Sequence, residues 1–184
     1  MKNSLLAPFV RIRPIRPADG EALERFYANL SPESRWARFF GGTSGLSHDQ
    51  SSSFCTPDHR HREGFVAELP AGERGAAHVV GHLCFEPDGA GTAEFAIAVA
   101  DAFQGRAIGR RLMNAGLEWA AGASVSTVTA TVLEGNGEIR RLVAAMGLPV
   151  SFRALGSNVL AVTIDLRRRT LQGFGADAGY SARQ

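Results

Sequence analysis

The chain has 184 residues, of which 45% are hydrophobic and 21% charged, and its formal net charge is +2. This balance is typical of a single globular domain, long enough to bury an ordinary core. Four arginines and one aspartate give residues 167–184 a charge of +3, so the other 166 residues carry about −1. Because the basic excess belongs to the tail, we expect neither nucleic acid nor a membrane as a partner.

The cysteines and histidines give little sign of a metal site or a disulfide. Cys55 and Cys84 are the two cysteines and do not form a CxxC pair, which is typical of a protein in a reducing cytoplasm. His59 and His61 form a His-x-His pair, but no carboxylate or cysteine cluster completes a metal site. The N-terminal segment is a poor signal peptide, and no apolar run reaches the roughly 18 residues of a spanning helix. We therefore expect a cytoplasmic protein without a metal.

Two helices are predicted after a first strand. Residues 9–16 alternate as a strand does, and apolar residues at helical spacing follow between positions 23 and 30. Ser31 and Pro32 have the residue types of an N-cap and a first helical residue. The second helix should end at Gly41-Gly42. Its aromatic residues, which we expect in the core, are Trp36, Phe39 and Phe40.

A polar segment at 43–62, predicted as a loop or a short helix, precedes the rest of the sheet. Turn sequences separate three further strands, which are therefore expected to be antiparallel neighbours. The strands are predicted at 64–69, 78–86, 92–100, 124–133, 149–155 and 158–166, and the helices at 104–121 and 136–147.

The resulting element order is β-α-α-β-β-β-α-β-α-β-β. It predicts an α+β fold in which a mixed, mostly antiparallel sheet of six to seven strands is flanked by about four helices. We expect this domain to span residues 9–166. The remaining residues, 167–184, have no periodicity and are expected to form a basic, flexible tail.

The segment between the 92–100 strand and the next helix has the composition of a phosphate-binding turn. Gly105, Ala107 and Gly109 are small, and the unpaired N–H groups at a helix start favour an anion. The P-loop pattern GxxxxGK[ST] and the Rossmann pattern GxGxxG are both absent. A dinucleotide-binding fold would also continue with βαβ units, whereas this chain consists mostly of hairpins.

Gln104-x-x-Ala107-x-Gly109 resembles the [RQ]-x-x-G-x-[GA] signature of the GNAT N-acetyltransferases. The resemblance extends to the AEFAIAV strand before the turn, to ATVLEGNGEIRRLVAAMGL after it, and to the element order over about residues 9–166. Within the family, NLSPESRWARFF together with Glu94 looks most like the bacterial protein lysine acetyltransferase domain. The resemblance implies transfer of acetyl from acetyl-CoA, as co-substrate, to a protein lysine or a small amine.

The resemblance also implies roles for particular residues. Glu94 would be the general base that takes a proton from the acceptor ammonium. The residues implied to bind the cofactor are Ile97, Ala98, Val99, Gln104, Gly105, Arg106, Ala107, Ile108, Gly109, Arg110 and Asn136. Structural interpretations stand beside these roles: Glu94 as a solvated edge carboxylate, the 97–99 segment as part of a closed ladder, and Asn136 as a helix N-cap.

Two departures from the family pattern leave a second function open. Ala107 replaces a glycine, and because alanine tolerates helical dihedral angles we expect weakened rather than lost cofactor binding. Val143 stands where many members carry a tyrosine that protonates the leaving thiolate. Another donor, water, or no assigned acid would then serve. The alternative function is a non-catalytic CoA-binding module with a sensing or partner-binding role.

Overall fold

The sheet of the predicted α+β fold is present in full. The structure is a computed structural model that describes residues 9–41, 45–70, 78–89 and 91–167. In this part of the chain seven strands form one mixed sheet in the order β1-β2-β3-β4-β5-β7-β6. The strands are β1 (Arg11–Pro14), β2 (Glu63–Leu69), β3 (His78–Pro87), β4 (Thr92–Val99), β5 (Thr127–Leu133), β6 (Val150–Gly156) and β7 (Val159–Asp165).

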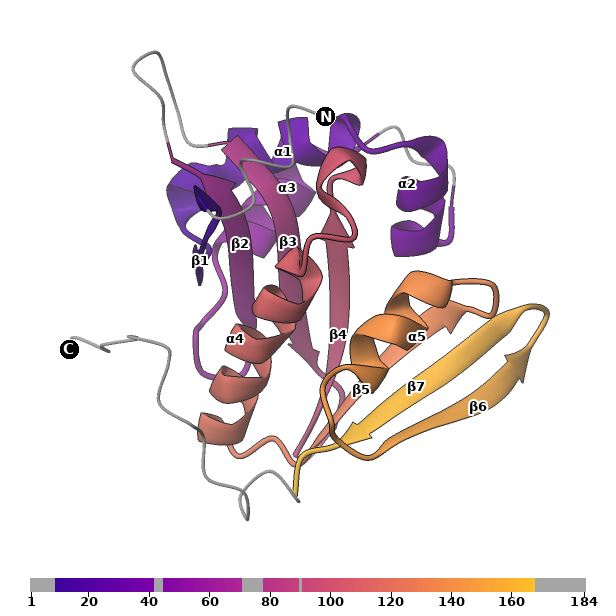
Figure 1. The fold of residues 1–184 in the computed structure, drawn as a ribbon. Helices are drawn as coiled ribbons and strands as arrows, with labels where there is room; N and C mark the ends of the chain where they lie inside the picture. The colour runs from indigo at the N-terminus through magenta and orange to yellow at the C-terminus, as the bar shows by residue number, and fades with distance from the viewer. Residues whose placement is uncertain (1–8, 42–44, 71–77, 90, 168–184) are drawn as a thin grey trace.

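Five α-helices cover the two faces of the sheet in the described ranges (Figure 1). They are α1 (Gly20–Ala28), α2 (Pro32–Phe39), α3 (His48–Cys55), α4 (Ile108–Gly122) and α5 (Gly137–Ala144). Helices α4 and α5 lie on one face, and α1 and α3 on the other. Short 3-10 turns, η3 (Pro17–Asp19) and η4 (Asp101–Phe103), precede α1 and follow β4. None of these helices has the length and apolar character needed to span a membrane.

Some boundaries differ from the sequence-based expectation. The polar segment at 43–62 contains α3, which makes five helices rather than about four. Helix α2 begins as predicted, with Ser31 as N-cap, but it ends at Phe39 because Phe40 adopts a left-handed conformation with φ 53°. Trp36, expected in the core, is 50% exposed. The predicted tail lies outside the described residues from position 168 on.

The core on the α4 face depends on close packing of that helix against β3 and β4. Ile108 and Leu112 of α4 are buried against the same cluster as Phe85 and Phe95. A Cβ atom added at Gly116 would lie only 2.3 Å from the Phe85 ring. The helix therefore approaches the strand more closely than any side chain at that position would allow.

The sheet opens between β4 and β5. These strands are parallel and pair only at Thr92↔Thr127, Ala93↔Val128 and Glu94↔Thr129. Beyond Glu94, β4 continues to pair with β3 as far as Val99, while β5 continues with β7. One edge of β4 therefore has no partner strand over residues 95–99, and the closed ladder considered for this segment does not form. On this segment the Val99 carbonyl accepts a hydrogen bond from the Gln104 side chain.

Candidate active site

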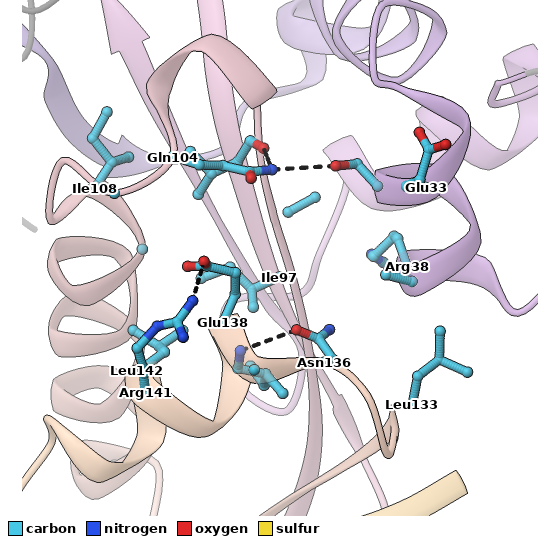
Figure 2. Close-up of a pocket in the computed structure, with 18 of the residues that line it drawn as sticks. Glu33, Arg38, Ile97, Gln104, Ile108, Leu133, Asn136, Glu138, Arg141 and Leu142 are labelled. Atoms are coloured by element: carbon cyan, nitrogen blue, oxygen red, sulfur yellow. Dashed lines mark hydrogen bonds and ion pairs between the residues drawn. The ribbon is translucent and has the colours of Figure 1, made fainter. Parts of the chain in front are cut away.

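A cleft of about 1190 Å³ occupies the opening between β4 and β5. Its walls come from α2, the open end of β4, the turn before α4, and the loop that joins β5 to α5. Figure 2 shows side chains of α2 on one side of this cleft and those of α4 and α5 on the other. The sheet itself thus provides the floor, and helix ends provide the rims.

The turn before α4 brings several backbone N–H groups to the cleft. Gly105 and Ala107 both have left-handed backbones, with φ 69° and φ 60°, and α4 begins at Ile108. The first bond within the helix runs from the Arg111 N–H to the Ala107 carbonyl, over 3.0 Å. The N–H groups of the first helical turn have no intrahelical acceptor, and with the helix dipole they favour an anion.

The conformation of Ala107 corrects the sequence-based argument. We expected alanine to fit here because it tolerates helical dihedral angles, but its φ and ψ are 60° and 8°. This left-handed conformation costs an L-residue about 1–2 kcal/mol, and glycine adopts it freely. The turn therefore has the left-handed backbone that glycine favours at this position of the signature. Because the residue is alanine, this conformation lowers the stability of the folded protein.

Most of the residues expected to bind the cofactor line this cleft. Those that do are Ile97, Ala98, Val99, Gln104, Gly105, Ala107, Ile108, Gly109, Arg110 and Asn136. Arg106 does not: its guanidinium carbon lies 5.9 Å from the Phe103 ring centre, and Nη1 is buried without a hydrogen-bond partner. Arg106 thus packs behind the turn.

Glu94 lies just outside the residues that line the cleft. It is the last β4 residue paired with β5, and it shares a face of the strand with Ala96 and Ala98. Its side chain is exposed and makes no ion pair within the described part of the chain. The carboxylate opposite it, Glu86, is held by Arg62 at 2.6 and 2.9 Å. Of these two carboxylates, Glu94 is the one without an ion-pair partner.

Asn136 and Val143 lie on α5 in different environments. The Asn136 side chain accepts a hydrogen bond from the Ile139 N–H at 3.1 Å, so it is the N-cap of α5, and it also lines the cleft. Val143 is 0% exposed and packs in the core. The position where many family members carry tyrosine is therefore apolar and sealed from the cleft.

Two features of the site carry no signal in the sequence. The first is Asp101 in η4, which accepts hydrogen bonds from the Ser31 N–H at 2.9 Å and from the Ser31 and Ser34 hydroxyls at 2.7 Å. These contacts hold the start of α2 against the end of β4. The second is Arg38, which lines the cleft from α2. A lone aspartate and a lone helical arginine belong to no recognisable motif.

Behind Arg38 lies a buried group of titratable side chains that are neutral near pH 7. Burial raises the pKa of Tyr27 to about 12 and also raises the pKa of the Cys84 thiol. Burial, together with the nearby Arg38 charge, lowers the pKa of His82 to about 3. His82 is 0% exposed, and its Nδ1 lies 2.8 Å from the Tyr27 hydroxyl. The described residues contain no group of three histidine, cysteine or acidic side chains that could hold a metal.

The chain combines an α+β sheet that opens between β4 and β5 with a turn whose N–H groups favour an anion. Residues 24–148 match the model of the acetyltransferase (GNAT) family. The chain therefore belongs to this family of enzymes, and the fold and the enzyme class expected from the element order and the turn are confirmed.

Solved structures give the same fold. The GNAT domain of S. lividans PAT is 27% identical, with a TM-score of 0.74 over 85% of this chain and 90% of that chain. A GCN5-related N-acetyltransferase from Kribbella flavida is 22% identical, with a TM-score of 0.68 over 86% and 99%. A putative acetyltransferase from Salmonella typhimurium, solved with its cofactor acetyl-CoA, is 18% identical, with a TM-score of 0.67 over 94% and 99%. Because the last two structures are less than 25% identical to this chain, they support the fold alone.

Proposed function

We propose that this enzyme transfers acetyl from acetyl-CoA to a primary amine by direct attack of the amine on the thioester. The observation that carries the proposal is the open edge of β4, which leads directly to the anion-binding turn. A cofactor with a linear amide arm and a pyrophosphate matches both parts. The solved relative that holds acetyl-CoA has the same fold.

The cofactor would lie along β4 as an added strand. The pantetheine amides would pair with backbone groups on the open edge of β4 over residues 97–99, in the way that extended peptides extend a sheet edge. The pyrophosphate would accept from the N–H groups of Ile108, Gly109 and Arg110 at the start of α4. An N–H group of the same β4 edge would polarise the thioester carbonyl and stabilise the oxyanion that forms on it.

Glu94 would act as general base through water. Only a neutral amine attacks a thioester, so the acceptor ammonium must lose a proton first. Glu94 borders the cleft without lining it, which favours relay through water over direct transfer. Attack forms the C–N bond, and collapse of the tetrahedral intermediate breaks the C–S bond and releases CoA thiolate. Because Val143 is buried and apolar, the thiolate would take its proton from solvent.

A protein lysine is the acceptor that resemblance favours. The support is the 27% identity to the S. lividans PAT domain and the NLSPESRWARFF segment, which forms α2 on the acceptor side of the cleft. A small amine is the other acceptor within this proposal. A non-catalytic CoA-binding module is the second candidate function, favoured by the buried Val143 and by the backbone strain at Ala107.

The test compares Glu94→Gln with the unchanged protein in acetyl-CoA binding and in acetyl transfer to a panel of lysine peptides and small amines. We expect Glu94→Gln to lower kcat by about 100-fold or more, which is the usual contribution of a general base, with an unchanged Kd for acetyl-CoA. Glu118→Gln, on the exposed side of α4, is the control with the same charge change. Tight cofactor binding without transfer to any amine would favour the non-catalytic module.

A further inference from the structure

Arg38 extends from α2 into a mostly aromatic cluster on the acceptor side of the cleft. Its guanidinium carbon lies 4.8 Å from the ring centre of Phe39, 5.7 Å from that of Phe54 and 5.9 Å from that of Tyr27. Nη2 donates to Cys84 Sγ over 3.4 Å, and Nε is buried without a hydrogen-bond partner. The Tyr27 side chain also interacts with the guanidinium. The Arg38 side chain is therefore oriented by stacking and by its contacts with Cys84 and Tyr27, and Nε has no partner.

Arg38 is the one formal charge in this cluster. No carboxylate of the described residues forms an ion pair with it, whereas the Arg13 and Arg62 guanidiniums are each held by acidic side chains. Its polar neighbours, Tyr27, Cys84 and nearby His82, are all neutral at pH 7. A partly buried cation among neutral groups is costly unless an anion accompanies it.

Arg38 also lines the cleft, together with Ala37 and Trp36. Figure 2 shows it on the α2 side, across from the residues of α5. Cys84, which Arg38 contacts, pairs with Ala96 of β4, and Glu94 lies two residues further on the same face. Arg38 and Glu94 therefore lie over the same face of the sheet, two strand positions apart along β4.

We propose that Arg38 binds a carboxylate on the acceptor, so that the substrate is an amine that carries a carboxylate near the reacting nitrogen. This inference rests on the proposed acetyl transfer. The planar guanidinium matches the geometry of a carboxylate and binds it through parallel hydrogen bonds. The amine of such a molecule would then lie toward Glu94, where it loses its proton. A free amino acid and a lysine beside an acidic residue in a peptide both provide this chemistry.

The experiment measures kcat/KM for pairs of acceptors that differ only in the carboxylate. The first arm compares glycine, β-alanine and 4-aminobutyrate, each with its own carboxamide. The three chain lengths vary the spacing between amine and carboxylate. The second arm uses lysine peptides with aspartate or asparagine beside the lysine. Both arms are run on the unchanged protein, on Arg38→Gln and on Arg35→Gln. Arg35, also on α2, lies outside the cleft lining and bonds to the Ala28 carbonyl.

We expect at least one pair to favour the carboxylate by about 10- to 100-fold, as a charged hydrogen bond does. Arg38→Gln should remove this preference, while Arg35→Gln keeps it and the Kd for acetyl-CoA stays unchanged in both. The arm that shows the preference identifies the source of the carboxylate. Equal rates for carboxylates and carboxamides in the unchanged protein would overturn the inference. This comparison uses only the unchanged protein, so it does not depend on whether a variant folds.

A second readout separates this inference from the proposed function. Calorimetric binding of the same acceptors to the protein–CoA complex reports the carboxylate contact without any chemistry. Carboxylate-selective binding that Arg38→Gln abolishes, in a protein that transfers no acetyl, would keep the carboxylate site and reject the transferase. Acetyl transfer without any carboxylate preference in rate or binding would keep the transferase and reject the carboxylate site.

Discussion

The Gln104 side chain joins the turn before α4 to α2, because its Nε2 donates to Ser34 Oγ over 3.2 Å. The same nitrogen lies 3.1 Å from the Val99 carbonyl at the end of β4. The Ser34 hydroxyl in turn donates to Asp101. The proposed cofactor side and the acceptor side of the cleft are therefore linked by a short chain of hydrogen bonds.

Asp101 is the residue on which this link depends most, since it accepts three hydrogen bonds from the start of α2. Asp101→Ala should lower the free energy of unfolding by about 1 kcal/mol, as expected for partly exposed contacts. Because α2 is loosened but β4 is not, KM for the acceptor should rise several-fold, with little change in KM for acetyl-CoA. Steady-state kinetics check this, with Asp88→Ala as control, and an equal rise in both constants would contradict it.

Replacing Ala107 with glycine should stabilise the protein. The left-handed φ of 60° costs alanine more than glycine, although glycine also gains entropy in the unfolded chain. The net gain should be about 0.5–1 kcal/mol in urea unfolding, with acetyl-CoA binding equal or tighter. Ala107→Val should act in the opposite direction on both quantities. A loss of stability in Ala107→Gly would show that the turn is not strained.

His82 should make stability depend on pH above the range where carboxylates titrate. Its pKa is lowered to about 3 in the folded protein, against about 6.5 in the unfolded chain. The unfolded state therefore binds more protons below pH 6.5, and stability falls as the pH falls toward 3. Between pH 7 and pH 5 the loss from this residue should be about 2 kcal/mol.

Unfolding by urea at several pH values measures this slope. His82→Gln should reduce the slope, whatever its effect on stability at pH 7. His78, at the exposed start of the same strand, provides the control His78→Gln, which should keep the slope of the unchanged protein. Identical slopes for the two variants would rule out His82 as the cause.

Gly116 is where α4 approaches β3, and Gly116→Ala should destabilise the fold. The added methyl would lie 2.3 Å from Phe85 and 2.6 Å from Leu83, so the helix or the rings must shift. Overpacking of this kind costs about 1–3 kcal/mol. Gly122→Ala, at the last residue of α4 with no atom within 4 Å of the new Cβ, should be neutral or slightly stabilising. Thermal unfolding compares the two variants, and equal melting temperatures would contradict the packing argument.

Local features of the sequence predicted much of the fold and the turn. Alternation located β1, turn sequences delimited β2, β3 and β4, and residue types located the N-caps Ser31 and Asn136, because these effects act within a few residues. The opening between β4 and β5 depends on where two distant strands stop pairing, which no local pattern reports.

Three residues show why the rest of the site could not be predicted. Trp36 has the type and spacing of a core residue, but α2 stands over the cleft, so that face of the helix meets solvent. Ala107 has an ordinary residue type, and its left-handed backbone is imposed by the turn between β4 and α4. Arg38 matters because its neighbours come from α1, α2, α3 and β3 and are neutral, which is a property of the packed structure.

Calorimetric titration with acetyl-CoA tests the proposed use of the cleft most directly. The unchanged protein should bind with a micromolar Kd, and CoA without its 3′-phosphate should still bind because the pyrophosphate contacts remain. Gly109→Asp should abolish binding while the fold is kept, since a Cβ fits at this position and the carboxylate would occupy the anion site. Asn114→Asp, on the exposed side of α4, should bind as the unchanged protein does. No binding by the unchanged protein at millimolar acetyl-CoA would contradict the proposal.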